Sequence, residues 1–265
     1  MARVHPTALV DARAELADDV EVGPYTLIGP KVRIGAGSRI GAHCIIEGHT
    51  TLGAGNVVYP FCALGAAPQD KKYAGEETQL QIGNGNTIRE YCSFNLGTVQ
   101  GGGVTRLGDD NWIMAYVHLA HDCIVGNHTT FANNATLAGH VEIRDWVILG
   151  GFTGVHQFVR VGEHAITGVS SVILQDVAPF VTGMGNTFEP SGINVEGLKR
   201  RGFSAERIAA LRRAFKLVFR SGLTLGDAAS ALSSLAADAP QASADLQLLA
   251  EFLGSTTRGL SRPRG

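Results

Sequence analysis

The sequence predicts a mainly β protein: a left-handed parallel β-helix of hexapeptide repeats followed by a C-terminal α-helical domain. Three observations support this fold class. An aliphatic residue recurs at every sixth position, a small residue stands two positions before it, and the spacing turns helical toward the C-terminus. The 34 glycines also suit an architecture of many tight turns. We expect the repeat domain to cover residues 1–190 and the helical domain residues 191–265.

The aliphatic series defines the coils of the predicted β-helix. It runs from Val4 to Leu64 and, after two interruptions, from Leu107 to Ile173, with Thr167 as its only polar member. Glycine often follows the aliphatic residue, as a tight turn demands. One aliphatic and one small inward position per hexad describe a short strand and a corner, so three hexads close a triangular coil of about 18 residues. Each coil buries its apolar face only against its neighbours.

The cysteines follow the same repeat. All four stand at the small inward position of a hexad, namely Cys44, Cys62, Cys92 and Cys123. We interpret them as stacked core residues rather than as disulfide partners or metal ligands, because the repeat already places them inside the prism.

Two polar, glycine-rich segments interrupt the repeat, at residues 65–81 and 95–106. Both are too irregular to form part of a coil, so we expect them to project as loops. Loops that leave a rigid scaffold commonly carry function, and the alternative is that these two are tolerated insertions.

The spacing in the last third of the chain is that of helices packed on the end of the repeat. Ser204 is expected to cap a helix that ends near Gly222 and that has its apolar residues on one face. Thr224 or Asp227 is expected to start a second helix, and residues 241–253 a third. Pro179 and Pro190 mark the ends of a connector between the two domains.

The first of these helices lies in a strongly basic stretch, although the whole chain has a formal net charge of -2. Against Glu206 alone stand Lys199, Arg200, Arg201, Arg207, Arg212, Arg213, Lys216 and Arg220. Because the first three precede the predicted helix, we favour a surface for a phosphate-bearing ligand or an acidic protein over an ordinary solvated helix face. We expect no nucleic acid, since interleaved aromatics and an RNA-binding motif are missing from the sequence.

The bulk properties indicate the compartment. A hydrophobic content of 45% supports a proper core. No stretch approaches the roughly 18 unbroken apolar residues of a membrane helix, and the start has no run resembling a signal peptide. We therefore expect a cytoplasmic protein with no integral membrane segment.

The candidate chemistry lies in the second half of the repeat, where histidines cluster. With about 18 residues per coil, Asp122 lies under His140 and His121 lies under Gly139. The third and fourth hexad positions face outward, so we expect His121, Asp122 and His140 on the surface of the prism. A histidine beside an aspartate makes a general base near neutral pH, and an amide near Gly139 can stabilise an oxyanion. Association of three prisms would turn this surface into three equal clefts.

Two other functions stay open at this point. Some hexapeptide β-helices hold zinc with three histidines from adjacent subunits and hydrate carbon dioxide, and His118 and His121 are three residues apart, a spacing that permits ligation. That alternative leaves the helical domain unexplained. A purely structural β-helix, whose histidines are ordinary surface residues, predicts that His121→Ala leaves function intact.

Several strings along the chain carry a family resemblance: VHPTALV, QDKKYAGE, GTVQGGGVT, HLAHDCIVGN, FANNATLAGHV, GGFTGVHQF and GINVEGLKRRGF. Together they resemble the UDP-N-acetylglucosamine acyltransferase family of lipid A biosynthesis, over essentially the whole chain. Single hexads are generic, whereas HLAHD together with VEGLKRRGF is highly specific.

The resemblance implies that a homotrimer without cofactor or metal moves a 3-hydroxyacyl chain from acyl carrier protein to the 3-position of UDP-N-acetylglucosamine, the first step of lipid A biosynthesis. It implies that His121 is the general base, that Asp122 supports it, and that the amide of Gly139 forms the oxyanion site. The basic helices would receive acyl carrier protein. The implied substrate contacts are Asp70, Lys72, His118, His140, His156, Gln157, Asn194, Glu196, Arg200 and Arg201.

The chain departs from the family pattern in two places. Asn95 and Leu96 stand where members often have His-Arg, which leaves open an acceptor with a 3-amino group and an amide product. Val169 stands where the family sets acyl length, a role the resemblance also gives to Thr187, and we expect valine to shorten the acyl slot relative to glycine. The related N-acyltransferase of the same pathway has an extra domain before its repeats, whereas the hexads here begin at Val4.

Overall fold

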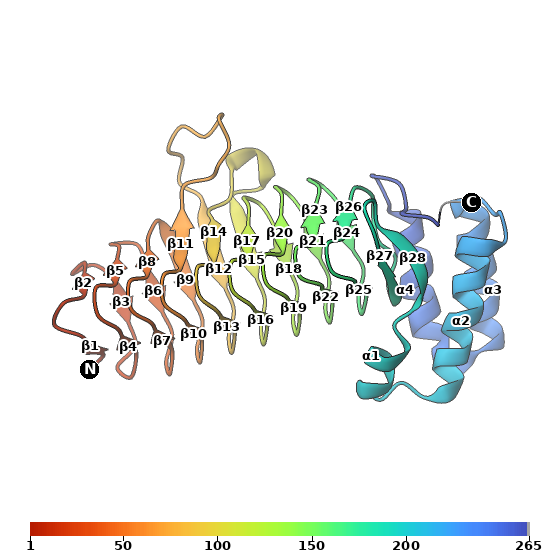
Figure 1. Cartoon of the computed structure of the whole chain (residues 1–265), viewed down its shortest axis with the longest axis horizontal. Coiled ribbons are helices and arrows are strands. Elements are labelled where there is room, and N and C mark those ends of the chain that lie inside the picture. The colour runs from red at the N-terminus through yellow and green to blue at the C-terminus, as the bar shows by residue number, and fades with distance from the viewer. Residues whose placement is uncertain (264–265) are drawn as a thin grey trace.

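The computed structural model describes residues 1–263, most of which form a left-handed parallel β-helix of short stacked strands (Figure 1). Neighbouring strands pair in parallel, as His118 does with Thr136 one coil later. The predicted fold class and the coil of about 18 residues are therefore confirmed.

The strands form three sheets, one for each side of a triangular prism. The first sheet contains β1 (Arg3–Val4), β4 (Glu21–Val22), β7 (Arg39–Ile40), β10 (Val57–Val58), β13 (Thr87–Ile88), β16 (Trp112–Ile113), β19 (Thr130–Phe131), β22 (Ile148–Leu149), β25 (Ile166–Thr167), β27 (Val181–Met184) and β28 (Glu189–Ile193). The second contains β2 (Leu9–Val10), β5 (Leu27–Ile28), β8 (Ile45–Ile46), β11 (Ala63–Ala66), β14 (Ser93–Asn95), β17 (His118–Leu119), β20 (Thr136–Leu137), β23 (Gly154–Val155) and β26 (Val172–Ile173). The third contains β3 (Glu15–Leu16), β6 (Arg33–Ile34), β9 (His49–Leu52), β12 (Gln79–Ile82), β15 (Val104–Leu107), β18 (Ile124–Val125), β21 (Glu142–Ile143) and β24 (Arg160–Val161).

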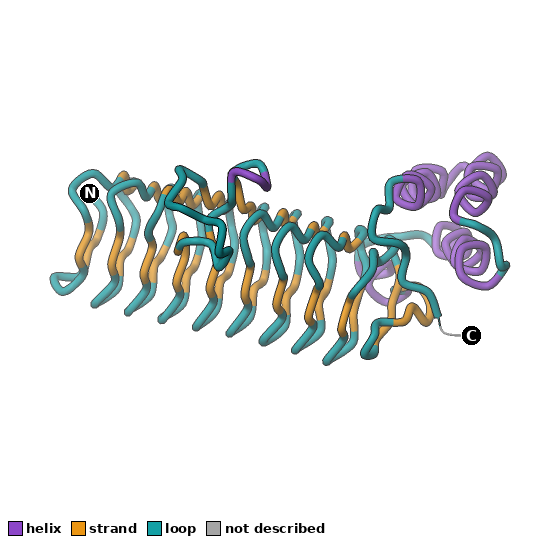
Figure 2. Tube along the Cα trace, turned by 90° about the horizontal axis from the view of Figure 1, so that it is seen from above, coloured by secondary structure: helices purple, strands orange, loops and turns teal. Residues whose placement is uncertain are grey.

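The chain visits the three sheets in turn, so the prism has three kinds of corner. We call the turn from the first to the second sheet the first corner, that from the second to the third the second corner, and that from the third back to the first the third corner. Figure 2 shows the coils as regular rungs, with the helices gathered at one end.

The inward aliphatic series forms one continuous core along the prism. Burying each such side chain contributes about 1.5–3 kcal/mol. Thr167 fits this core because its hydroxyl oxygen accepts from the amide of Gly150 and bonds to the hydroxyl of Thr153, both at 2.9 Å. The four cysteines are buried and free, as predicted.

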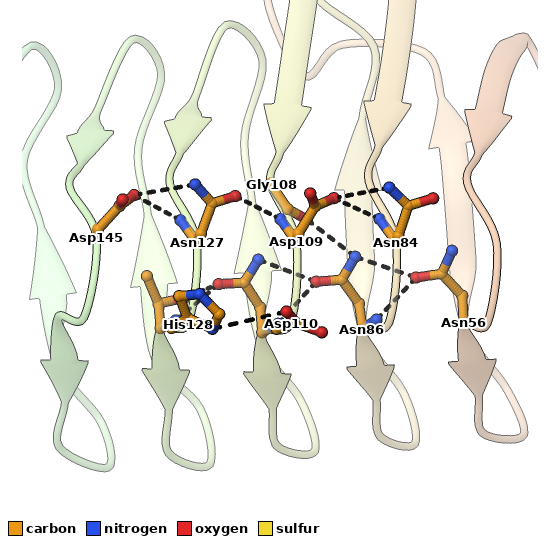
Figure 3. Close-up of polar contacts among 11 residues, drawn as sticks. Asn56, Asn84, Asn86, Gly108, Asp109, Asp110, Asn127, His128 and Asp145 are labelled. Atoms are coloured by element: carbon orange, nitrogen blue, oxygen red, sulfur yellow. Dashed lines mark hydrogen bonds and ion pairs between the residues drawn. The ribbon is translucent and has the colours of Figure 1, made fainter. Parts of the chain in front are cut away.

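An internal ladder of asparagines replaces small residues at three inward positions, a feature that the sequence analysis missed (Figure 3). The side-chain oxygen of Asn56 accepts from the amide and side chain of Asn86, both at 3.0 Å. The oxygen of Asn86 accepts in the same way from Asn111, at 2.9 Å, and that of Asn111 accepts from Thr129. Each buried amide therefore has a partner one coil away, which fixes the register of the coils.

A second ladder follows the third corner, also seen in Figure 3. Asp109 accepts from the amide of Asn84 at 2.6 Å, Asn127 from that of Asp109 at 2.7 Å, and Asp145 from that of Asn127 at 2.7 Å. These side chains satisfy corner amides that the sheets leave unpaired.

Two segments leave the coils at the second corner (Figure 1). We call residues 67–78, between β11 and β12, the first loop, and residues 96–103, between β14 and β15, the second loop; the outer residues of the expected segments 65–81 and 95–106 belong to these strands. The second loop contains a 3₁₀ turn, η1 (Val99–Gly101). Asn95 and Leu96 are buried and tie the two loops together, because the Asn95 side chain donates to Ala67 O at 2.9 Å and Leu96 N donates to Ala66 O at 3.0 Å.

Within residues 1–263, four helices pack on the end of the prism: α1 (Val195–Arg200), α2 (Ala205–Arg220), α3 (Leu225–Asp238) and α4 (Ser243–Gly254), with a 3₁₀ turn, η2 (Pro240–Ala242). Ser204 caps α2 and Thr224 caps α3, as predicted. None of the helices in the described part of the chain is long and apolar enough to cross a membrane.

Two elements before α2 were not expected from the sequence. β27 and β28 form an antiparallel hairpin that extends the first sheet, where a connector was expected. Lys199 and Arg200, expected to precede the first helix, lie inside the short helix α1. The hexad pattern has faded here, and a helix of six residues is too short to show a clear periodicity.

Candidate active site

The second corner presents His121 and Asp122 directly after β17. The Nδ1 atom of His121 lies 2.8 Å from Oδ2 of Asp122. An ionised carboxylate only accepts hydrogen bonds, so Nδ1 carries the proton and Nε2 has the free lone pair. The side chain of His121 is 16% exposed, which leaves Nε2 within reach of a substrate. This is the geometry of a general base with an orienting carboxylate.

The expected surface position of Asp122 is wrong, because its side chain is only 1% exposed. The second loop covers it. Thr98 donates to both carboxylate oxygens, from its amide to Oδ1 and from its hydroxyl to Oδ2, each at 2.7 Å. The hexad position of Asp122 could not predict its burial, because the loop that covers it comes from a different coil.

Gly139 lies against the ring of His121, as the coil arithmetic predicted. A Cβ atom added to Gly139 would stand 2.5 Å from Cε1 of His121. Only glycine therefore lets the imidazole rest on the main chain at this point.

His140 is the next histidine along the second corner. Its Nδ1 atom lies 3.7 Å from Oδ2 of Asp122, and its ring meets that of His121 edge-on, with centroids 5.1 Å apart. Burial is the main cause that lowers the pKa of His140, and the Asp122 and Asp70 carboxylates oppose it. His140 is therefore neutral at pH 7 and can donate or accept a hydrogen bond.

His118 lies on β17 and faces outward from the second sheet, beside the corner. Its Nδ1 atom is 2.8 Å from the hydroxyl of Ser93. Burial lowers the pKa of His118, so this ring is also neutral at pH 7.

The first loop brings Asp70 close enough to act electrostatically on His140, whereas Lys72 is exposed. Asp70 accepts from the amide of Lys72 at 3.0 Å. One coil beyond His140, His156 and Gln157 continue the second corner. Arg258, from the C-terminal segment, donates to Nδ1 of His156 at 3.2 Å, a contact that the sequence analysis missed because it joins residues far apart in the chain.

The nucleotide-end residues expected from the resemblance lie at the third corner, away from His121. Figure 1 places α1 at the edge of the prism opposite the two loops. Asn194 caps α1 and donates to His164 O at 2.9 Å. Arg201 donates to Trp146 O at 3.1 Å and to Nδ1 of His164 at 3.2 Å. One protomer therefore does not bring these residues together with His121.

Glu196 and Arg200 are exposed on α1, and Glu196 pairs with Lys199 at 2.9 Å.

The two residues expected to set acyl length are also separate from His121. Val169 is 68% exposed at the first corner, and Thr187 lies in the turn between β27 and β28.

The basic surface is smaller than the sequence indicated. Arg207 forms a two-point ion pair with Asp245, with both N–O distances at 2.8 Å, and lies over Phe203. Arg201 is turned toward the prism. The basic surface therefore consists of the other six basic residues, all exposed: Lys199, Arg200, Arg212, Arg213, Lys216 and Arg220.

Acid is expected to weaken folding through His164. Burial, followed by the Arg201 guanidinium, lowers the pKa of His164 to about 4. An unfolded chain binds this proton near pH 6.5, so stability falls as the pH drops from about 6.5 toward 4. Because solvent partly screens this ring, we expect the free energy of unfolding in urea to be about 1 kcal/mol lower at pH 5 than at pH 7.

The matched variant is His164→Phe, because Phe158 holds the same corner conformation at a positive φ of 64°. Its unfolding energy should change less between the two pH values. An equally steep change in this variant would show that another group is responsible.

One group in the described residues could hold a metal ion, formed by His121, Asp122 and His140, whose ligand atoms lie within 4.8 Å of one another. His118, which the zinc alternative needs, is not part of it. Both carboxylate oxygens of Asp122 already accept from Thr98, so an ion would have to compete with these bonds.

Known proteins match this chain along almost its whole length. Residues 105–139 match the family model described as bacterial transferase hexapeptide (six repeats), and residues 176–261 match that described as UDP N-acetylglucosamine O-acyltransferase, domain 2. The acyl-[acyl-carrier-protein]–UDP-N-acetylglucosamine O-acyltransferase of Verminephrobacter eiseniae is 60% identical over 262 residues, which cover 99% of this chain and 100% of the relative. That of Thiobacillus denitrificans is 58% identical over 264 residues, with the same coverage.

Solved structures extend the likeness to three dimensions. LpxA from Acinetobacter baumannii is 44% identical, with a TM-score of 0.93 over 98% of this chain and 99% of that one. The UDP-N-acetylglucosamine acyltransferase from Francisella novicida is 35% identical, with a TM-score of 0.94 over 99% of this chain and 95% of that one.

Proposed function

Since this chain belongs to the UDP-N-acetylglucosamine O-acyltransferase family of lipid A biosynthesis, we propose that it moves an (R)-3-hydroxyacyl chain from acyl carrier protein to the 3-hydroxyl of UDP-N-acetylglucosamine, with His121 as general base. The family gives the acyltransferase activity. The observation that carries the role of His121 is its pairing with the buried carboxylate of Asp122 at 2.8 Å.

The chemical step follows from the free lone pair on Nε2 of His121. Nε2 takes the proton of the sugar hydroxyl as its oxygen attacks the thioester carbonyl, and Asp122 stabilises the imidazolium that forms. As the tetrahedral intermediate collapses, the C–S bond breaks and the imidazolium returns its proton to the departing sulfur of the carrier protein. The products are a sugar ester and a free thiol.

The oxyanion of that intermediate lies at Gly139 in this proposal. The His121 ring rests against the main chain of Gly139, so a carbonyl carbon attacked beside Nε2 is near this amide. A main-chain donor fixed by the coil stabilises the charge without reorganisation. His118 and His140, both with lowered pKa values, line the site as neutral partners for the substrate.

The site is completed by a second protomer in a proposed homotrimer. Asn194, Glu196 and Arg200 lie at the third corner, so a substrate that contacts them and His121 must bridge two copies. The second sheet and the first corner expose apolar side chains that suit such packing. They include Leu9, Leu27, Ile45 and the stacked rings of Tyr25, His43, Phe61, Tyr91 and Tyr116. The cytoplasmic location stays a prediction.

An acyl-transfer assay tests the proposed function. Purified protein is given 3-hydroxyacyl carrier protein of several chain lengths, with UDP-N-acetylglucosamine or its 3-amino analogue, and the product is identified by mass spectrometry and NMR. We expect an ester at the 3-position and no loss of activity with a chelator. Acylation of the amine alone would establish the amide-forming alternative, and chelator-sensitive hydration of carbon dioxide without acyl transfer would establish the zinc hydratase.

Val169 is expected to limit acyl length. Its Cγ2 atom would stand 3.9 Å from a Cβ atom on Gly151 of the preceding coil, so valine fills space at this corner that glycine would leave open to an acyl chain. Val169→Gly should therefore shift the preferred donor to a longer chain, measured with competing acyl donors in one reaction. A preference of the wild-type protein for the longest donor, unchanged in the variant, would contradict this role.

A further inference from the structure

The second loop does more than cover Asp122. We propose that Thr98 is a positioning residue, which holds the Asp122 carboxylate so that Asp122 in turn holds His121 in the base-competent tautomer. This inference rests on the proposed function, because it assigns a role to the loop in the same proton transfer. It makes the second loop a working part of the active site rather than a tolerated insertion.

Among the described residues, three hydrogen bonds reach the carboxylate of Asp122, which is the acceptor in each. Oδ1 of Asp122 accepts from the amide of Thr98, and Oδ2 accepts from the hydroxyl of Thr98 and from Nδ1 of His121, at 2.7, 2.7 and 2.8 Å. The Thr98 hydroxyl accepts in turn from the amide of Gly101 at 3.2 Å. Since a carboxylate cannot donate, the proton on each bond is assigned without ambiguity.

Thr98 and Asp122 are both buried, so losing a hydrogen bond between them costs more than it would at the surface. As whole residues, Thr98 is 2% exposed and Asp122 is 5% exposed, so water cannot easily replace a hydrogen-bond donor that a substitution removes. The amide of Asp122 donates to the hydroxyl of Thr105 at 2.8 Å, which fixes the backbone on the other side. Thr98 therefore holds the carboxylate of Asp122, and Thr105, on β15 after the second loop, holds its main chain.

The glycines of the second loop make this close approach possible. A Cβ atom on Gly101 would stand 2.0 Å from Cγ of Asp122, so only glycine allows the turn to lie over the carboxylate. Gly102 and Gly103 have φ values of 92° and 82°, which other residues rarely adopt. The glycine run thus serves the contact between Thr98 and Asp122.

The turn of the second loop that carries Thr98 is also bonded to the base of the first loop. Gly103 donates to Thr98 O at 2.8 Å, which closes the turn, and Gly97 donates to Gln79 O at 3.1 Å, at the base of the first loop. The base of the first loop is thus linked to His121 by the hydrogen bond of Gly97, the peptide bond from Gly97 to Thr98, and the hydrogen bonds of Asp122 with Thr98 and His121.

The test compares Thr98→Val with Thr98→Ser in the purified protein. Valine removes the hydroxyl donor at nearly constant volume, and we expect kcat to fall about 10-fold to 100-fold with KM for both substrates unchanged. Serine retains the donor and should restore at least half of the wild-type kcat. Thr26→Val is the matched control, because Thr26 is a fully buried threonine whose hydroxyl donates to Gly41 O at 2.7 Å, in an N-terminal coil. It should change the melting temperature and not kcat.

A second readout does not depend on activity. With ¹⁵N-labelled histidine, the ring-nitrogen NMR signals that disappear in His121→Ala report the tautomer of His121. We expect the Nδ1–H form in the wild-type protein and a mixture of tautomers in Thr98→Val. Wild-type kcat and an unchanged tautomer in Thr98→Val would overturn the inference. If the wild-type protein itself transfers no acyl chain to the sugar, the proposed function fails instead.

Discussion

Replacing His121 with alanine is expected to lower kcat about 1000-fold, a larger effect than we expect from any other single substitution. General-base catalysis by a positioned side chain is worth about 10²- to 10⁴-fold, and the structure offers no other base that is held by a buried carboxylate at this corner among the described residues. The measurement is steady-state acyl transfer with the carrier protein thioester and UDP-N-acetylglucosamine. KM should change little, because the lost interaction forms in the transition state.

His128→Ala provides the matched control for this substitution. His128 belongs to the third corner of the same region, stacks on Trp146 with centroids 4.2 Å apart, and lies 3.7 Å from an oxygen of Asp110. It is a partly exposed histidine beside an aspartate, but no substrate contact is proposed for it. We expect its kcat to stay within about twofold of wild type. A His121→Ala protein as active as His128→Ala would remove the base from the mechanism.

Reversing the charge of the basic face of α2 is expected to raise KM for the acyl carrier protein thioester about 100-fold. The triple variant Arg212→Glu, Arg213→Glu and Lys216→Glu changes three exposed residues without touching the ion pair of Arg207 with Asp245. Exposed charges steer an acidic partner and set its encounter rate, so kcat at saturation should change little. The effect should shrink as salt is added.

Two controls separate docking from chemistry in that experiment. A small pantetheine thioester, which has no acidic surface, should react equally with wild type and variant. The same change in net charge at the opposite end, through Arg13→Glu, Arg33→Glu and Arg39→Glu, should leave KM for the carrier protein unchanged within about threefold. If both triple variants raise KM equally, the basic face of α2 is not the docking surface.

The repeat could be predicted well because the hexad rule places each side chain independently of distant contacts. Cys123 and Thr167 are buried where their hexad positions put them, and Gly139 lies against His121 as coil arithmetic required. The same rule put Asp122 at an outward position and could not foresee that Thr98 covers it. Such a contact depends on the shape of a loop, and a loop has no repeating sequence pattern from which its contacts can be predicted.

Two other features could not be predicted from the sequence, because both depend on contacts between residues that are far apart in the chain. The asparagine ladder through Asn86 is an exception to the small-residue position, since these amides are tolerated only because each finds a partner on the next coil. The contact of Arg258 with His156 joins residues from the two domains, and nothing in the local sequence of either predicts it.

Each proposed cleft combines His121 of one protomer with the α1 surface of another. Mixing variants tests it directly. Equal amounts of His121→Ala chains and of Glu196→Ala, Arg200→Ala chains, each nearly inactive alone, are unfolded together and reassembled. In a random trimer about a quarter of the clefts then pair an intact His121 with an intact α1 surface. We predict recovery of about a quarter of wild-type activity, whereas a mixture that stays as inactive as its parents would contradict a site shared between protomers.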